Sequence, residues 1–231
     1  MSDTKPCMKI TLTDTKPSIF ESKIGGLGYI PHDKDFPTDS DGNQLRLLAQ
    51  IECDKIQLDG FMKTGLLQFW ILNDDVSGMD VWGTTNQDGF RVIYYPEIDR
   101  TVTKKEIEEK FIKNEYDDYE DEYFPVFSEC GMSFEKSENR FIDYCQELPE
   151  EVYDENTGHK VGGYPYFTQS DPRDEKMLEY YDFLLFQLDT DYLCHEAIVM
   201  WGDSGVGNFF VNSEKLKNCD FSDVLYNWDC C

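Results

Sequence analysis

Two lysines occupy matching positions in the sequence and are the first candidates for binding chemistry. Lys23 and Lys160 lie 137 residues apart, and each is followed, after one apolar residue, by a Gly-Gly pair. A lysine at both positions of an acid-rich chain requires a local partner. That partner is either a carboxylate, in an internal salt bridge, or a small anionic ligand held between two repeated units. Together with Trp201 and Asp203, the two lysines form our candidate ligand-binding set.

The acidic residues and cysteines do not follow the spacing of a metal site. Asp189, Asp191 and Asp203 offer carboxylate oxygens of the kind that calcium binds, but no EF-hand loop surrounds them. None of the eight cysteines belongs to a C-x-x-C pair, so the zinc-ribbon and thioredoxin spacings are both absent. We therefore expect no metal and no cofactor.

The residues that could act as nucleophiles lack the partners that catalysis needs. Ser204 lies in a Gly-Asp-Ser-Gly string, which is similar to the string around the nucleophile of trypsin-like serine proteases. That chemistry requires a histidine and an aspartate in a double-barrel framework, which the sequence does not offer. Cys194 and His195 are neighbours in sequence, and adjacency alone does not bring two side chains together. No catalytic residue is assigned, and whether the protein is an enzyme is left open.

The net charge of −26, from 47 acidic and 21 basic residues, restricts the classes of partner. A field of this sign repels phosphate backbones, so we expect no nucleic-acid binding. The Gly-Gly pairs also lack the spacing of P-loops and dinucleotide-binding loops, and they predict tight backbone turns instead. The same field would steer basic proteins toward the surface.

Nearly half of the charge excess lies between Lys104 and Glu155, a stretch with 18 acidic and 6 basic residues. Its residues 115–123 combine acids, which steer association, with tyrosines, which supply contact area in interfaces. Our leading interpretation is a non-enzymatic binding protein that engages a basic protein partner here. The alternative is an enzyme or small-ligand-binding protein with its site in a cleft between two lobes. The candidate partner-binding residues are Glu115, Asp117, Asp118, Tyr119, Glu120, Asp121 and Glu122.

The elements that must position these residues are mostly strands. Short apolar or β-branched runs bounded by turn residues predict strands, and a T-x-x-E capping box at Thr103 predicts a helix. Asp171 followed by Pro172 predicts the start of a second helix, which ends near Tyr181. The predicted strands are 28–30, 45–51, 66–72, 90–95, 183–188, 197–201, 209–211 and 224–228, and the first helix is 103–114.

Segments of the first part of the chain return in the second part. Residues 47–51 resemble residues 184–188 at the same offset of 137, and residues 65–71 resemble 205–211. Three similar segments in the same order predict an internal duplication. Gln50 and Gln187 lie inside the repeated apolar runs, where a bare amide would be costly, so we expect both to be buried and hydrogen-bonded to the backbone.

The predicted fold class is α+β, mainly antiparallel β, with two pseudo-equivalent lobes from the duplication. We expect a first repeat lobe at residues 1–100, an acidic connecting segment with a helix at 101–156, and a second repeat lobe at 157–231, packed as one compact unit.

Several strings of the sequence resemble one known family along nearly the whole chain. Residues 200–210 read MWGDSGVGNFF, residues 160–167 read KVGGYPYF, and residues 220–228 read DFSDVLYNW. These strings, with 22–26 and 65–69 in the first part, are similar to the YwqG family of uncharacterised proteins. The resemblance is weakest between about residues 101 and 156. It implies no reaction and supplies no catalytic residues.

The sequence has no apolar run near the length of about 20 residues that crosses a bilayer, and no apolar core of a signal peptide. We expect a soluble cytoplasmic protein that does not bind membranes. The sequence makes no prediction of its oligomeric state.

Overall fold

The computed structural model describes residues 4–113, 123–142 and 154–230. Within them, ten strands form one antiparallel sheet in the order β12-β11-β8-β7-β1-β6-β2-β3-β4-β5. The sheet strands are β1 (Thr4–Thr13), β2 (Lys23–Ile24), β3 (Arg46–Glu52), β4 (Leu66–Ile71), β5 (Phe90–Tyr95), β6 (Cys130–Arg140), β7 (His159–Gly162), β8 (Phe183–Asp189), β11 (Val206–Val211) and β12 (Val224–Asp229). The other elements are the hairpin β9 (Asp191–Leu193) and β10 (Glu196–Val199), the helices α1 (Lys104–Lys110), α3 (Glu175–Tyr180) and α4 (Ser213–Lys217), and the single turns η1 (Cys53–Lys55) and η3 (Asp154–Asn156). The fold is thus mainly antiparallel β with few helices, as the sequence predicts.

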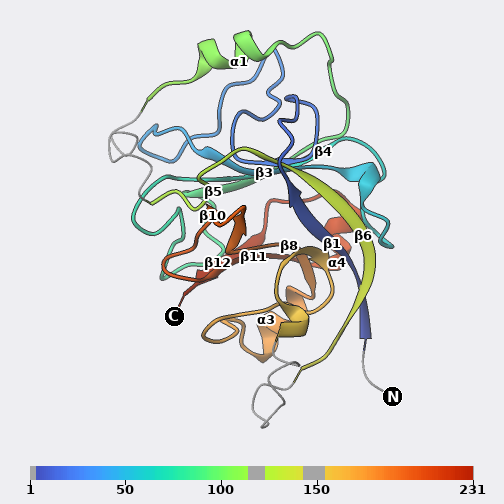
Figure 1. The fold of residues 1–231 in the computed structure, drawn as a ribbon. Helices are drawn as coiled ribbons and strands as arrows, with labels where there is room; N and C mark the ends of the chain where they lie inside the picture. Colours follow the sequence, from blue (N-terminus) through green and yellow to red (C-terminus); the bar gives the residue numbers. More distant parts are fainter. Residues whose placement is uncertain (1–3, 114–122, 143–153, 231) are drawn as a thin grey trace.

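The sheet folds back on itself so that its two ends face each other across the core. We call β2 to β5 the first half-sheet, and β7, β8, β11 and β12 the second half-sheet. Figure 1 shows them as two layers, with the long strands β1 and β6 running from one layer to the other. The edge strands approach each other closely enough for the rings of Phe90 and Tyr226 to lie 5.1 Å apart. The sheet is therefore nearly closed, which leaves little exposed strand edge.

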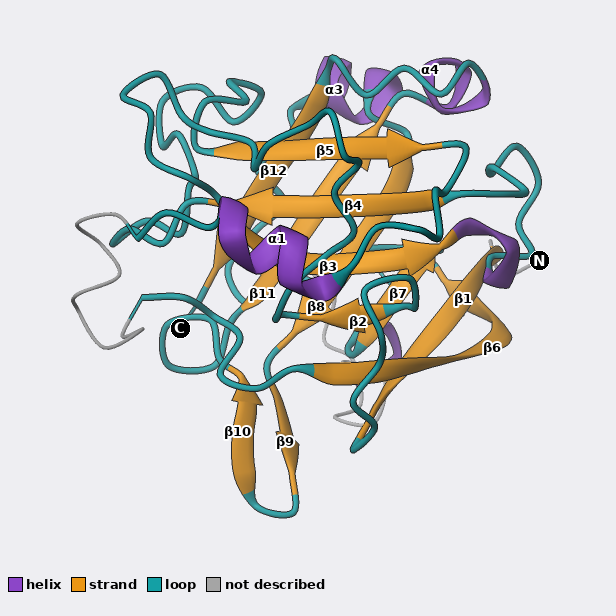
Figure 2. Cartoon of the chain, turned by 90° about the horizontal axis from the view of Figure 1, so that it is seen from above, coloured by secondary structure: helices purple, strands orange, loops and turns teal. Residues whose placement is uncertain are grey.

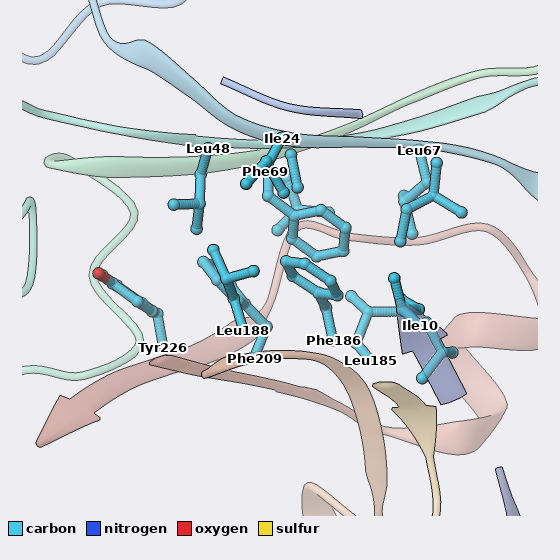
Figure 3. Packing of buried hydrophobic residues seen from close by; sticks show 14 of the residues in the cluster. Ile10, Ile24, Leu48, Leu67, Phe69, Leu185, Phe186, Leu188, Phe209 and Tyr226 are labelled. Atoms are coloured by element: carbon cyan, nitrogen blue, oxygen red, sulfur yellow. The ribbon is translucent and has the colours of Figure 1, made fainter. Parts of the chain in front are cut away.

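The main hydrophobic core fills the space between the two half-sheets. Phe69 from β4 packs against Phe186 and Phe209, with ring centroids 4.7 and 5.0 Å apart. Figure 3 shows these rings meeting midway, with leucines from both half-sheets around them. Alternate residues of β4 and β11 point the other way, because successive side chains of a strand lie on opposite faces. Each half-sheet therefore has an inner face on this shared core and an outer face of its own.

The two half-sheets match each other in register. Lys23 lies opposite Gln50 across β2 and β3, and Lys160 lies opposite Gln187 across β7 and β8. The pairing of β3 with β4 shifts between Leu47 and Ala49. The pairing of β8 with β11 shifts at the corresponding place, between Leu184 and Phe186 on β8. Whether the halves arose by duplication stays a prediction, and so do the predicted lobe boundaries.

The prediction for the two glutamines is confirmed. Gln50 and Gln187 are fully buried, and each side-chain oxygen accepts a backbone N–H at 2.8 Å, from Tyr29 and Tyr166 respectively. Each side-chain nitrogen donates to two backbone carbonyls, those of Ile19 and Glu21 in one case and of Asn156 and Gly158 in the other. Each amide thus binds two segments to the sheet: the loop that follows its Gly-Gly pair, and the segment that precedes the lysine of the same repeat.

The outer faces of the half-sheets are covered unequally. On the first half-sheet, α1 and the chain between β1 and β3 build a second core of ten buried side chains around Trp70 and Leu47. On the second half-sheet, α3 and the chain before it cover a core that has four buried members within the described ranges: Tyr181, Leu184, Phe210 and Leu225. Figure 1 shows α1 above one layer and α3 below the other. The second outer face is therefore less completely filled.

Several local predictions differ from the structure. Residues 28–30 form a loop held by Gln50 and Gln68, and the short strand lies earlier, at β2. The second helix begins after Asp174, whose side chain accepts the Met177 N–H, because Asp171 is engaged by Arg173. The first helix has its capping bond from Glu106 to Thr103 as predicted, but it ends at Lys110. The strands β1, β6, β7 and β9 were not predicted from the sequence.

The hairpin of β9 and β10 extends away from the sheet (Figure 2). Cys194 and His195 form its tip, and both have a positive φ, at 52° and 71°. Both side chains are exposed. Among the described residues, no helix is both long and apolar enough to cross a membrane.

Candidate functional site: a cavity on the outer face of the second half-sheet

A cavity of about 760 Å³ lies on the outer face of the second half-sheet, beside α3. Its wall comes from the ends of β1 and β6, from η3, from the chain between β7 and α3, and from the outer side chains of β8 and β11. The lining residues are Lys5, Phe141, Ile142, Asn156, Gly163, Tyr164, Pro165, Tyr166, Phe167, Thr168, Gln169, Ser170, Asp171, Arg173, Leu178, Asp182, Leu184 and Phe210.

The loop after β7 is held firmly where it forms the wall. Gly163 has a φ of +75°, and a β-carbon there would lie 2.1 Å from the Asn139 side-chain oxygen, so only glycine fits. The Gly163 N–H donates to the Pro6 carbonyl at 3.0 Å. Further along, Gln187 accepts from the Tyr166 N–H and Asn208 donates to the Tyr166 carbonyl. The Gly-Gly pair is therefore a tight turn, as predicted, and it sets the position of the aromatic residues that follow it.

Aromatic rings dominate the lining. Phe210 is fully buried at the floor and stacks on Phe167, with ring centroids 6.1 Å apart. Phe141 and Tyr164 meet edge to face at 5.6 Å, and Phe141 remains 59% exposed. An edge-to-face pair presents both ring faces and ring edges to a neighbour, which suits the packing of further rings.

The arginine in the wall is fully engaged by the protein itself. Arg173 donates two hydrogen bonds to Asp171, at 2.9 and 2.6 Å, and a third to the Tyr181 carbonyl at 2.9 Å. Its guanidinium lies 3.8 Å from the centroid of Phe210. A bidentate pair of this kind fixes both side chains and cancels their charges locally. Arg173 is thus a structural part of the wall.

Lys5 is the other cation in the lining. It stands near the start of β1 on the exposed side of the strand, and its ammonium lies 4.7 Å from the centroid of Tyr164. No ion pair of Lys5 occurs among the residues that the structure describes. Its charge is therefore available to a bound molecule at the aromatic wall.

Asn156 contributes a buried polar group to the same wall. Its side chain is completely buried, and its nitrogen donates to the Arg140 carbonyl at 3.3 Å. Its side-chain oxygen is buried and has no hydrogen-bond partner within the described part of the chain, as is also true of Asn139 and Asn208. Asn156 is therefore a structural part of the wall, and its oxygen does not by itself indicate a ligand.

The first half-sheet has a smaller cavity in the corresponding place, of about 290 Å³. Gly26, Leu27, Leu45 and Leu47 line it, and these residues stand 137 positions before four residues of the larger cavity: Gly163, Tyr164, Asp182 and Leu184. Two further rings reach the smaller cavity from outside the half-sheet, Phe36 from a loop and Phe111 from the end of α1. They meet edge to face, with centroids 5.8 Å apart.

The four candidate ligand-binding residues do not gather in one place. Lys23 and Lys160 are both buried, and β1 and β6 lie between their strands in the sheet. Trp201 is buried in the main core, where its ring lies 5.9 Å from Trp228, whereas Asp203 is exposed. None of the four lines either cavity.

The two lysines differ in their partners. The Lys23 ammonium forms a salt bridge of 2.8 Å with Glu129, a residue between the predicted lobes. Burial nevertheless lowers the pKa of Lys23, against the opposing effect of Glu129. Lys160 instead donates to the Asn156 carbonyl, and no carboxylate among the described residues forms a salt bridge with it. Burial lowers the pKa of Lys160 to about 7, although Cys7 and Asp189 act in the other direction. This amine is therefore partly neutral at physiological pH.

The remaining predictions concern metals and the acidic segment. Within the described ranges, no three histidine, cysteine or acidic side chains converge in a way that could hold a metal ion. The candidate partner-binding residues, Glu115, Asp117, Asp118, Tyr119, Glu120, Asp121 and Glu122, lie outside the described residues.

The residues of the larger cavity were not predicted from the sequence. One signal was present: where the first unit has Leu27-Gly28-Tyr29-Ile30, the second has Tyr164-Pro165-Tyr166-Phe167, with more aromatic residues. That difference between the units marks the place where the second outer face departs from the first.

Comparison with known proteins gives a family without an assigned activity. A family model described as "Domain of unknown function (DUF1963)" matches residues 22–230. The match includes every strand of the sheet except β1, which precedes it. No curated protein matches the chain. The name of the YwqG family, to which the sequence strings are similar, stays a prediction.

Proposed function

The chain belongs to this family, the domain of unknown function DUF1963, and we propose that it binds a small organic molecule in the cavity on the outer face of the second half-sheet. The sequence led us to expect a small-ligand site in a cleft between two lobes. We now propose it on one face of the second half-sheet. Whether the bound molecule is also converted is left open, because none of the lining residues forms a nucleophile–base pair.

One observation carries the proposal: the same outer face is filled in the first half-sheet and open in the second. Among the described residues, ten buried side chains form the core on the first face and four form the core on the second. The resulting space of about 760 Å³ falls in the range of about 300–1,000 Å³ that is usual for sites of small ligands. Its lining is apolar with a few fixed polar groups, which is the usual composition of such sites.

We also infer that the two half-sheets derive from a duplicated unit. The matching register of the lysines, the matching β-bulges and the equivalent bonds of Gln50 and Gln187 support this inference. A duplicated unit begins with two equal outer faces. One copy can then keep the covering that stabilises the fold while the other opens a site.

The neutral aromatic dye N-phenyl-1-naphthylamine tests the proposal, because its fluorescence rises on entering an apolar site. We expect saturable binding with a dissociation constant in the range of about 1–100 μM, from the usual binding energy per atom of such ligands. Leu178 on α3 lines the cavity and is 44% exposed, so Leu178→Trp should fill the space without disturbing the core. We expect this variant to bind the dye at least about tenfold more weakly.

The matched control is Tyr192→Trp, which adds a tryptophan at an exposed position of β9 outside the cavity. It should bind the dye like the parent. Circular dichroism would establish that both variants are folded. Absence of saturable binding to the parent, or equal binding by Leu178→Trp, would exclude the cavity as a ligand site.

A second function, the capture of a basic protein, rests on the charge of −26 and on the acidic residues 115–122. Changing the six acids Glu115, Asp117, Asp118, Glu120, Asp121 and Glu122 to Asn or Gln should weaken salt-sensitive association with basic proteins, mainly through slower capture. It should leave the melting temperature equal or higher, because repulsion among like charges is relieved. Surface plasmon resonance with cytochrome c as a basic probe, at low and high salt, measures the first effect. Unchanged capture would place the binding surface elsewhere.

A further inference from the structure

We infer that the ligand of the larger cavity carries an aromatic ring and an anionic group, with the ring against Tyr164 and the anion at the ammonium of Lys5. This inference rests on the proposed binding function and specifies the chemistry of the molecule that is bound. Three features of the described residues support it: the rings of the wall, the contents of the smaller cavity, and the charges around the mouth.

The wall favours an aromatic ligand. Five rings line the wall, one from the residue after β6, three from the loop after β7 and one from β11: Phe141, Tyr164, Tyr166, Phe167 and Phe210. Offset and edge-to-face ring pairs add about 0.5–1.5 kcal/mol beyond the burial of apolar area, so a wall of this composition selects rings over aliphatic chains of equal size.

The smaller cavity indicates the shape of such an occupant. In the first half-sheet the chain's own rings, Phe36 and Phe111, occupy the space above the residues that correspond to the wall of the larger cavity. Phe36 also packs edge to face on Trp70, at 5.7 Å. In the second half-sheet the space is about 470 Å³ larger, being about 760 against 290 Å³. A ring from a bound molecule would restore the packing that the first half-sheet obtains from its own chain.

The charges around the cavity leave one site for an anion. Asp171 and Arg173 pair with each other, and Asp182 accepts the N–H and hydroxyl of Ser213 at 2.7 and 2.8 Å. Lys5 is the remaining charged group of the wall; its ammonium lies over the ring of Tyr164 and forms no ion pair among the described residues. An anionic group attached to a ring that packs on Tyr164 would reach this ammonium. An ion pair that forms next to an apolar wall is stronger than an ion pair that water surrounds completely.

Two dyes that differ by one charge test the inference. 8-Anilinonaphthalene-1-sulfonate and N-phenyl-1-naphthylamine share the anilinonaphthalene ring system, and only the first carries a sulfonate. Lys5→Gln should weaken binding of the sulfonate dye about three- to tenfold and leave binding of the neutral dye within about twofold. Leu178→Trp should weaken both dyes, which places the sulfonate dye in the cavity.

Lys9→Gln is the matched control, because Lys9 is a second exposed lysine of β1 that does not line the cavity. It should leave both dyes unchanged. If the neutral dye binds and Lys5→Gln affects both dyes equally or neither, the anion site is wrong while the binding function stands. If the cavity takes up the neutral dye and not the sulfonate dye, the inference is likewise wrong. If neither dye binds the parent, the binding function fails and the inference fails with it.

Discussion

Replacing Phe209 by alanine is expected to lower the free energy of unfolding by about 3–5 kcal/mol, because a fully buried ring is lost from the centre of the main core. Phe209 stacks on Tyr226 at 4.5 Å and also contacts Phe69 and Phe90 at 5.0 and 6.1 Å. Those neighbours belong to both half-sheets, so the space left behind cannot close by the movement of one of them alone.

Urea denaturation followed by tryptophan fluorescence and by far-ultraviolet circular dichroism measures this loss. The two signals should coincide in one transition for the parent and for Phe209→Ala, because a shared core unfolds as a unit. Phe127→Ala is the control, since Phe127 is 49% exposed and its loss should cost less than about 1 kcal/mol. Two separate transitions would mean that the halves fold independently, contrary to the shared core.

Replacing Lys160 by methionine should stabilise the protein most at acidic and neutral pH. The pKa of Lys160 is lowered by burial to about 7 from a usual 10.5, so the folded state disfavours the proton that the unfolded state binds. The free-energy cost of burying the charged amine is complete below pH 7, and it falls as the pH rises from 7 toward 10.5. Methionine carries no proton and fills a similar volume. The Asn156 carbonyl keeps the hydrogen bond from Gln187, at 3.0 Å, so no acceptor is orphaned.

The measured quantity is the difference in free energy of unfolding between Lys160→Met and the parent, as a function of pH. The two proteins share all other titratable groups, so the contributions of those groups cancel in this difference. It should shrink by about 2–3 kcal/mol between pH 6 and pH 9. Lys23→Met provides the contrast: it removes the partner of Glu129, at 2.8 Å, so the gain from removing a buried charge is offset by the lost salt bridge, and the stabilisation should be smaller than for Lys160→Met. Parallel curves for Lys160→Met and the parent would show that the pKa of this amine is not lowered.

The sequence was informative where a residue type conflicted with its surroundings. A glutamine inside an apolar run must find hydrogen bonds, and this alone predicted the burial and the backbone bonds of Gln50 and Gln187. The apolar runs of β3, β4, β8 and β11 were likewise evident, because these strands are buried on both faces. The mainly antiparallel β class followed from such runs.

The strand β6 escaped prediction because its order comes from pairing rather than from side chains, whereas β1 carries a local signal that was missed, the alternation of buried Met8, Ile10 and Leu12 with polar residues. Most side chains of β6 are partly or fully exposed, so the segment shows no apolar periodicity. Its backbone pairs with β1 over ten residue pairs, from Thr4 with Arg140 to Thr13 with Gly131. No local pattern records a partner that lies so far along the chain.

The cavity was hidden for a similar reason. Lys5 and Tyr164 lie far apart in the sequence, and the pairing of β1 with β7 brings them together. A cavity also forms where too few side chains cover a sheet, and amino-acid composition does not show where that happens. Comparison of the two repeated units was the one route to it, through the additional rings after the second Gly-Gly pair.

The central place of β1 governs the order in which the chain can fold as it leaves the ribosome. This strand is made first, yet its partners β6 and β7 follow more than a hundred residues later. The first half-sheet also lacks its neighbour β6 and its opposing core surface until most of the chain has been made. Such distant pairing closes long loops and makes folding slow. During synthesis the apolar strands of the first half-sheet remain exposed, and they are the segments that chaperones would protect.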